Sequence, residues 1–246
     1  MSDLAGKVAL VTGASSGLGA AVARVFAQRG ALVFGVARDE GRLAATFADV
    51  PGGRYAIADI TTSAACESVV EHCVAEFGRI DTLINVAGFH RMRHTAEVTD
   101  TDWEHDLAVN LNAPFYLCRA ALPHLLSVAG NIVNVASIAG TEGQAYSAGY
   151  CAAKHGLIGL TRALAVEYTA DRLRVNAVCP GGMLTPQVTE FVLPEGADPN
   201  LVMRVAAPRG LSDPGDVAKV IAFLAGDDAA SVHGAVYLAD NGKTAG

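Results

Sequence analysis

Charged residues are scarce in this sequence, and basic residues are scarcer than acidic ones. Only 17% of the 246 residues are Asp, Glu, Lys or Arg, and 18 basic against 25 acidic residues give a net charge of −7. This balance disfavours nucleic acid and anionic membrane surfaces as partners. No run approaches the roughly 18–20 apolar residues of a membrane span, and residues 1–7 lack the pattern of a signal peptide. We therefore expect a soluble, cytoplasmic protein with neither nucleic acid nor a membrane as partner.

Cysteines are also few. The five are scattered, odd in number and never spaced as Cys-x-x-Cys: Cys66, Cys73, Cys118, Cys151 and Cys179. This pattern argues against a disulfide framework and against a zinc site. We expect reduced, buried thiols and no bound metal.

Short apolar segments alternate with segments of helical periodicity along most of the chain. The strand-like segments are 7–11, 31–37, 54–58, 82–86, 131–136, 173–178 and 235–238. The helix-like segments are 17–29, 39–49, 63–77, 102–127, 149–169 and 214–224. Strands without polar alternation are typical of burial on both faces, and β–α alternation favours right-handed crossovers. The sequence predicts an α/β fold: a single-domain, Rossmann-like, doubly wound parallel sheet of about seven strands over residues 1–246.

One segment, 181–208, breaks this rhythm. It holds four prolines, at positions 186, 194, 199 and 208, and is too long for an ordinary connection. We expect it to be a mobile substrate lid over a site.

A glycine-rich segment follows the first expected strand. Residues 12–19 read Thr-Gly-Ala-Ser-Ser-Gly-Leu-Gly and lead into the first expected helix. Glycines let the backbone approach a pyrophosphate closely, and the helix N-terminus adds partial positive charge. The spacing differs from the commoner Gly-x-Gly-x-x-Gly of dinucleotide folds. It still predicts a dinucleotide site, formed by Gly13, Ser15, Ser16, Gly17, Leu18 and Gly19.

The end of the second strand distinguishes the two nicotinamide cofactors. An acidic residue there binds the ribose 2′-hydroxyl of NAD(H), whereas a nearby arginine suits the 2′-phosphate of NADP(H). Here the strand ends at Ala37 and Arg38 follows, which favours NADP(H). Two alternatives stay open. In the first, Arg38 is only the solvent-exposed start of the next helix. In the second, Asp39 pairs with Arg38 or itself accepts a ribose hydroxyl, and the cofactor is NAD(H).

Tyr150 and Lys154 stand four residues apart in the expected helix 149–169, which places them on one face. A phenol with its usual pKa near ~10 is a poor acid or base at neutral pH, but a neighbouring ammonium group lowers that pKa. Ser137 follows the expected strand 131–136, at the sheet edge where open α/β folds bind ligands. Its hydroxyl would hold a substrate oxygen against Tyr150, or it simply starts a turn.

Residues 89–94, Phe-His-Arg-Met-Arg-His, follow the fourth expected strand and border the expected substrate cleft. Their basic side chains would recognise a carboxylate or phosphate, or they form a solvated basic loop.

Together these motifs resemble those of the short-chain dehydrogenase/reductase family over essentially the full length. The resemblance rests on 12–19, Asp59-Ile60-Thr61, Asn85-Val86-Ala87-Gly88, Asn110, Ser137, Tyr150 with Lys154, and 180–185. It implies a catalytic tetrad of Asn110, Ser137, Tyr150 and Lys154. It further implies an adenine pocket at Asp59 and Ile60, a strand-end segment along the cofactor at Asn85, Ala87 and Gly88, and a nicotinamide segment at Pro180, Gly181 and Thr185.

The resemblance also implies a reaction. A hydride passes between NADP(H) and a carbonyl or secondary alcohol, with Tyr150 as general acid/base, Lys154 on the nicotinamide ribose and Asn110 holding a water that relays protons to Lys154. A homotetramer or homodimer is implied as well. The alternatives are an NAD-linked alcohol dehydrogenase of hydroxysteroid or hydroxyacid type, and a non-catalytic nucleotide sensor that keeps the fold.

Overall fold

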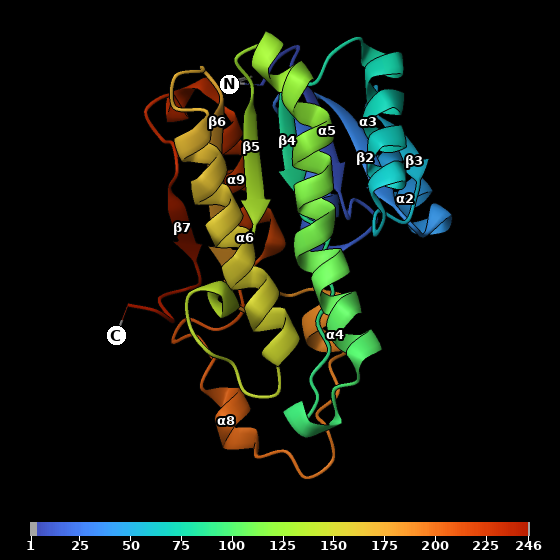
Figure 1. Ribbon diagram of the computed structural model, residues 1–246. Coiled ribbons are helices and arrows are strands. Elements are labelled where there is room, and N and C mark those ends of the chain that lie inside the picture. The colour runs from blue at the N-terminus through green and yellow to red at the C-terminus, as the bar shows by residue number, and fades with distance from the viewer. Residues whose placement is uncertain (1–3, 246) are drawn as a thin grey trace.

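Seven parallel strands form one sheet at the centre of the computed structural model, which describes residues 4–245 (Figure 1). The strand order is β3-β2-β1-β4-β5-β6-β7. The strands are β1 (Val8–Thr12), β2 (Leu32–Ala37), β3 (Arg54–Ile57), β4 (Thr82–Asn85), β5 (Asn131–Val135), β6 (Arg174–Pro180) and β7 (Val236–Ala239). The predicted doubly wound parallel sheet is confirmed; residues 1–3 and 246 of the predicted domain, and part of the 1–7 segment, lie outside the described residues.

Helices cover both faces of the sheet. The longer ones are α1 (Gly17–Gln28), α2 (Glu40–Phe47), α3 (Ser63–Phe77), α4 (Asp100–Leu107), α5 (Ala113–Ser127), α6 (Ala148–Glu167) and α9 (Pro214–Ala225). Figure 1 shows α3, α5 and α6 in front of the sheet and α9 behind it. Alternate strand residues explain the two layers, because Ala9 and Val11 pack with α1 and α9 while Val8 and Leu10 pack with α3 and α5.

The site is positioned by the order of the strands. The strand β1 lies between β2 and β4: the chain runs outward from β1 to β3 on one side, and then crosses back to β4 on the other side. Open α/β sheets bind ligands outside the carboxyl ends of the strands at such a reversal. The glycine-rich segment leaves β1 at this point.

The expected helix 102–127 is interrupted. The structure has α4, a π-helical turn (Ala108–Asn112) and then α5. Pro114, in the first turn of α5, has no N–H to donate to the Asn110 carbonyl four residues upstream. Just before it, the Ala113 N–H donates to the Ala108 carbonyl five residues upstream and not to the Val109 carbonyl four residues upstream. Turns of this kind recur at functional sites, and this one carries Asn110.

The segment 181–208 contains two short helices, α7 (Pro186–Thr189) and α8 (Pro199–Met203), rather than plain loop. Short 3₁₀ turns occur at Thr95–Glu97, Ile138–Gly140 and Asp227–Ala229. All five cysteines are free thiols, and Cys151 alone among them is not buried. None of the helices in residues 4–245 combines the length and apolar character needed to cross a membrane.

Candidate active site

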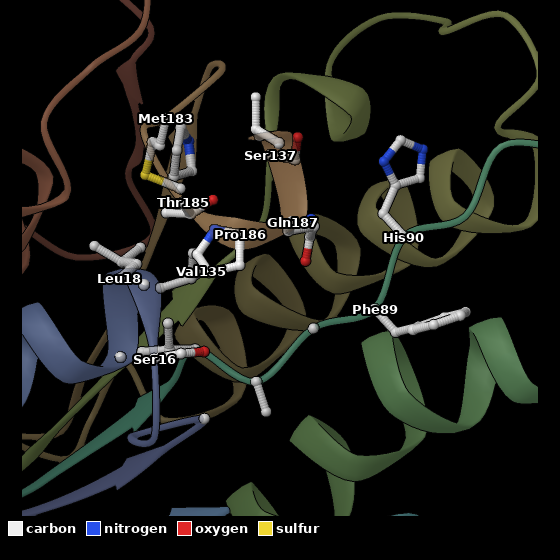
Figure 2. A pocket seen from close by; sticks show the side chains of 18 of the residues that line it. Ser16, Leu18, Phe89, His90, Val135, Ser137, Met183, Thr185, Pro186 and Gln187 are labelled. Carbon is white, nitrogen blue, oxygen red and sulfur yellow. The ribbon is translucent and has the colours of Figure 1, made fainter. Parts of the chain in front are cut away.

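A cavity of about 1030 Å³ opens along the carboxyl edge of the sheet (Figure 2). Most residues predicted for the site line it: Gly13, Ser15, Ser16, Gly17, Leu18, Gly19, Arg38, Asp59, Ile60, Ala87, Gly88, Ser137, Tyr150, Lys154, Pro180, Gly181 and Thr185. They come from the ends of several different strands, so the fold rather than the sequence order gathers them. Asn85 and Asn110 are buried beside the cavity and do not line it.

The glycine-rich loop is packed too tightly for side chains at two positions. Gly13 has a φ of +68°, and a Cβ there would lie 2.9 Å from Ala87 Cα. A Cβ at Gly19 would lie 2.1 Å from the Gly13 carbonyl oxygen. The Thr12 hydroxyl ties this loop to the end of β4, because it accepts the Val86 and Ala87 N–H groups at 3.1 Å each. The glycines therefore close a tight turn that brings backbone up to the cavity.

The N-terminus of α1 faces the cavity without a side-chain cap. Ser16, the N-cap residue, makes no capping hydrogen bond, and the first turn of the helix holds no acidic residue. The free N–H groups and the helix dipole favour an anion at this place. A pyrophosphate fits both the charge and the glycine cradle, so the residues present suit a dinucleotide cofactor.

Two arginines after β2 line the cavity: Arg38, which follows the strand, and Arg42, in the first turn of α2. Asp39 is occupied as the N-cap of α2: it accepts the Arg42 N–H at 2.9 Å and pairs with Arg42 Nε at 3.3 Å. Arg42 was not identified from the sequence, although it stands one helical turn after Arg38. Arg38, Asp39 and Arg42 therefore all border the cavity here, with the Asp39 carboxylate paired to Arg42.

Tyr150 and Lys154 lie side by side near the start of α6, and both are buried. Lys154 Nζ is 5.6 Å from the centre of the Tyr150 ring and donates to the Val135 carbonyl at 2.9 Å. The predicted juxtaposition of phenol and ammonium is present. Ser137 starts a turn, since its Oγ accepts the Ala139 N–H at 3.1 Å, and its hydroxyl also lies close enough to the Tyr150 phenol to act on that group's pKa.

Burial dominates the electrostatics of this pair. It raises the pKa of Tyr150 to about 12, against hydrogen bonds from Ser137 and Gln187 that act downward. It lowers the pKa of Lys154 to about 8. The lowered tyrosine pKa predicted from the Tyr150–Lys154 spacing is therefore not the net direction in this structure, because loss of hydration outweighs the hydrogen bonds from Ser137 and Gln187.

Asn110 fixes the chain that leaves β4. Its Oδ1 accepts the Phe89 N–H at 3.1 Å, and its Nδ2 donates to the carbonyls of Phe89 and Asp106 at 2.8 and 2.9 Å. Both Nδ2 protons are thus used. Asn85 instead supports the sheet, donating to Asn134 Oδ1 at 2.9 Å.

Besides Arg42, the cavity residues that escaped prediction as site residues include His90 and Gln187 (Figure 2). His90 belongs to the segment 89–94, which the sequence indicated only as a border of the cleft. Gln187 lies in α7, within the predicted lid, and no local motif marks it. Within residues 4–245, no group of three or more His, Cys, Asp or Glu side chains is arranged to hold a metal ion.

Comparisons with known proteins agree with this geometry. The family model described as short chain dehydrogenase matches residues 7–195. The chain is 36% identical to meso-2,3-butanediol dehydrogenase of Serratia marcescens, over 97% of this chain and 95% of that protein. It is 35% identical to D-threitol dehydrogenase of Mycolicibacterium smegmatis, over 98% of this chain and 94% of that protein.

Among solved structures, 3-ketoacyl-(acyl-carrier-protein) reductase from Brucella melitensis, complexed with NADH, matches with a TM-score of 0.90. Its identity is 30%, and the match covers 98% of this chain and 99% of that one. The chain therefore belongs to the short-chain dehydrogenase/reductase family. It is an NAD(P)-dependent oxidoreductase with the Rossmann-like fold of that family.

Proposed function

We propose that this enzyme interconverts a carbonyl compound and a secondary alcohol with NADP(H), using Tyr150 as general acid/base. The observation that carries the proposal is the buried Tyr150 phenol at the wall of the dinucleotide-sized cavity, with Ser137 and Lys154 beside it. The relatives named above act on 2,3-butanediol, threitol and a 3-ketoacyl group. Such a substrate class suits this chain as well.

Each residue has a defined part in reduction. Bound NADPH supplies the hydride that the carbonyl carbon accepts. Ser137 and Tyr150 donate hydrogen bonds to the carbonyl oxygen, where negative charge develops. Tyr150 then gives up its proton; a pKa of about 12 means that the phenol holds that proton at neutral pH. Lys154 would bind the nicotinamide ribose and, with a pKa of about 8, exchanges protons near neutral pH.

The preference for NADP(H) rests on Arg38 and Arg42. Both arginines line the cavity, as does Asp39, whose carboxylate pairs with Arg42. A guanidinium group suits a 2′-phosphate better than a free hydroxyl. The alternative, an NAD-linked alcohol dehydrogenase, is favoured by one observation: the Brucella melitensis reductase is complexed with NADH.

The loss of reduced-cofactor absorbance with a panel of carbonyl compounds tests both the proposed reaction and the proposed preference for NADP(H). We expect turnover with NADPH to exceed turnover with NADH. Arg38→Ala should raise KM for NADPH about tenfold, the loss of one charge-assisted contact, while KM for NADH changes less than about twofold. Arg54→Ala, which removes an exposed arginine outside the cavity, is the matched control. Equal effects of Arg38→Ala on both cofactors would support NAD instead.

We also propose a homotetramer in the cytoplasm. Large apolar side chains are exposed on the helices that cover one face: Trp103 on α4, Phe115 on α5 and Val166 on α6. Exposed large apolar side chains on adjoining helices are typical of protein–protein contacts. Light scattering should give about four times the chain mass of 25.3 kDa. A mass of one chain would refute the assembly and leave the proposed reaction untouched.

A further inference from the structure

His90 stacks on the proposed acid/base tyrosine. The centres of the His90 and Tyr150 rings lie 4.4 Å apart, and the ring planes are inclined by 30°. Asn110 fixes the preceding residue, Phe89, through both backbone groups, so the position of His90 is set by the π-helical turn. Figure 2 shows the imidazole facing the same space as Ser137 and Gln187. His90 therefore borders the place where the reacting carbonyl must lie.

The hydrogen bonds around Ser147 define which nitrogen of His90 carries the proton. The Ser147 hydroxyl donates its single proton to the Ala145 carbonyl at 3.1 Å. It must then accept the hydrogen bond that joins it to His90 Nε2 at 2.9 Å. The proton is therefore on Nε2, and Nδ1 carries a free lone pair.

This lone pair is available to a ligand. Among residues 4–245, no group bonds to Nδ1, and the nitrogen is not sealed away from the cavity. Burial, aided by the charge of Lys154, lowers the pKa of His90 to about 4, so the imidazole stays neutral at physiological pH. The ring thus offers one fixed acceptor next to the reacting oxygen.

We propose that His90 determines specificity by accepting a hydrogen bond from a hydroxyl group on the carbon next to the reacting carbonyl. The substrates would be α-hydroxy ketones in reduction and vicinal diols in oxidation. This inference rests on the proposed function. Because the imidazole lies one ring thickness from the Tyr150 phenol, a group that reaches Nδ1 is attached close to the carbon that accepts the hydride. A purely apolar substrate would leave Nδ1 desolvated and unpaired, which disfavours its binding.

Three ketones that share a carbon skeleton test the proposal in the wild-type enzyme. These are 3-hydroxybutan-2-one, 3-methoxybutan-2-one, which lacks the donor, and butan-2-one, which lacks the oxygen. We expect kcat/KM to be about tenfold or more higher for the hydroxy ketone than for either comparison compound. Equal values for the hydroxy and methoxy ketones would overturn the proposal, since the methyl ether can accept but cannot donate.

The variant His90→Phe tests whether His90 causes the preference for the hydroxy ketone. Phenylalanine keeps a ring against Tyr150 and removes Nδ1, so the ratio of hydroxy to methoxy ketone should fall to within about threefold whatever the absolute rates. His155→Phe, at an exposed position of α6 outside the cavity, should retain the wild-type ratio. A His90→Phe enzyme that is slower on all three ketones but keeps the ratio would overturn the proposal. If that variant does not fold, the wild-type ratios still decide.

Failure of the inference is distinct from failure of the proposed function. Reduction of butan-2-one without preference for the hydroxy ketone refutes the role of His90 and leaves the oxidoreductase mechanism standing. No reduction of any ketone in a broad panel refutes the proposed function and the inference with it.

Discussion

Lys154 is buried, and it donates a hydrogen bond to the Val135 carbonyl. Burial lowers its pKa from 10.5 to about 8, a difference that corresponds to about 3 kcal/mol of lost stability while the lysine is charged. Between pH 8 and 10.5 the unfolded chain binds the proton and the folded chain does not. The free energy of unfolding therefore rises with pH across this window.

Lys154→Met should consequently be more stable than the wild type at pH 7. The gain of about 3 kcal/mol is reduced by about 1 kcal/mol for the lost hydrogen bond to Val135. Chemical unfolding at pH 7 and pH 10 measures the difference in the free energy of unfolding between the variant and the wild type. This difference should be smaller at pH 10. Lys219→Met, at an exposed lysine, should show no such trend. A Lys154→Met protein less stable than the wild type at pH 7 would contradict the account.

Among the elements, the turn between β1 and α1 is the most constrained. A methyl group at Gly19 would meet the Gly13 carbonyl, whereas a methyl group at Gly159 in α6 meets nothing within 4 Å. Gly19→Ala should therefore displace the loop, lower stability by about 1–3 kcal/mol and weaken cofactor binding. Gly159→Ala should be neutral or stabilising by up to about 1 kcal/mol. Thermal unfolding and cofactor titration compare the two variants. Equal stability and equal cofactor affinity would show that the close approach of Gly19 to the Gly13 carbonyl does not constrain the turn.

The elements differ in how far the sequence reveals them. Buried strands and amphipathic helices follow from apolar periodicity, and contiguous motifs such as the glycine-rich segment and Tyr150 with Lys154 have local signals. The π-helical turn at Ala108–Asn112 has none, because a proline in the first turn of a helix is ordinarily tolerated. Asn85 was expected along the cofactor, but its position in β4 turns the side chain toward Asn134.

Site residues that lie outside local motifs could be identified only from the three-dimensional structure. Gln187 and His90 reach Tyr150 because the segment 181–208 and the segment after β4 converge there, and no sequence spacing encodes that convergence. The direction of the Tyr150 pKa was missed for the same reason. Spacing shows the neighbouring ammonium group, whereas burial depends on the whole enclosure.

At the scale of the whole molecule, the segment 181–208 connects the cavity with distant loops. The Asp198 N–H donates to the Tyr146 hydroxyl at 2.9 Å, and the His94 ring bonds the Glu195 carbonyl at 2.8 Å. On either side of these anchors along the chain, Phe191 and Met203 line the cavity yet remain 49% and 65% exposed. Closure over bound cofactor and substrate would bury them.

Hydrogen exchange should detect this closure. We expect exchange in peptides covering 186–203 to slow severalfold when NADPH and substrate analogue are both bound, while peptides of the central strand β5 stay unchanged. Protection of the glycine-rich loop without protection of 186–203 would show that the segment is a fixed wall and not a lid.

The central claim is that the Tyr150 hydroxyl transfers the proton that accompanies the hydride. Tyr150→Phe removes this one oxygen and leaves Lys154 and the glycine-rich loop in place. We expect kcat to fall by about 10³-fold while the Kd for NADPH changes less than about twofold. Tyr146→Phe, which removes a hydroxyl that does not line the cavity, should keep kcat within about threefold. Turnover by Tyr150→Phe within tenfold of the wild type would contradict the account.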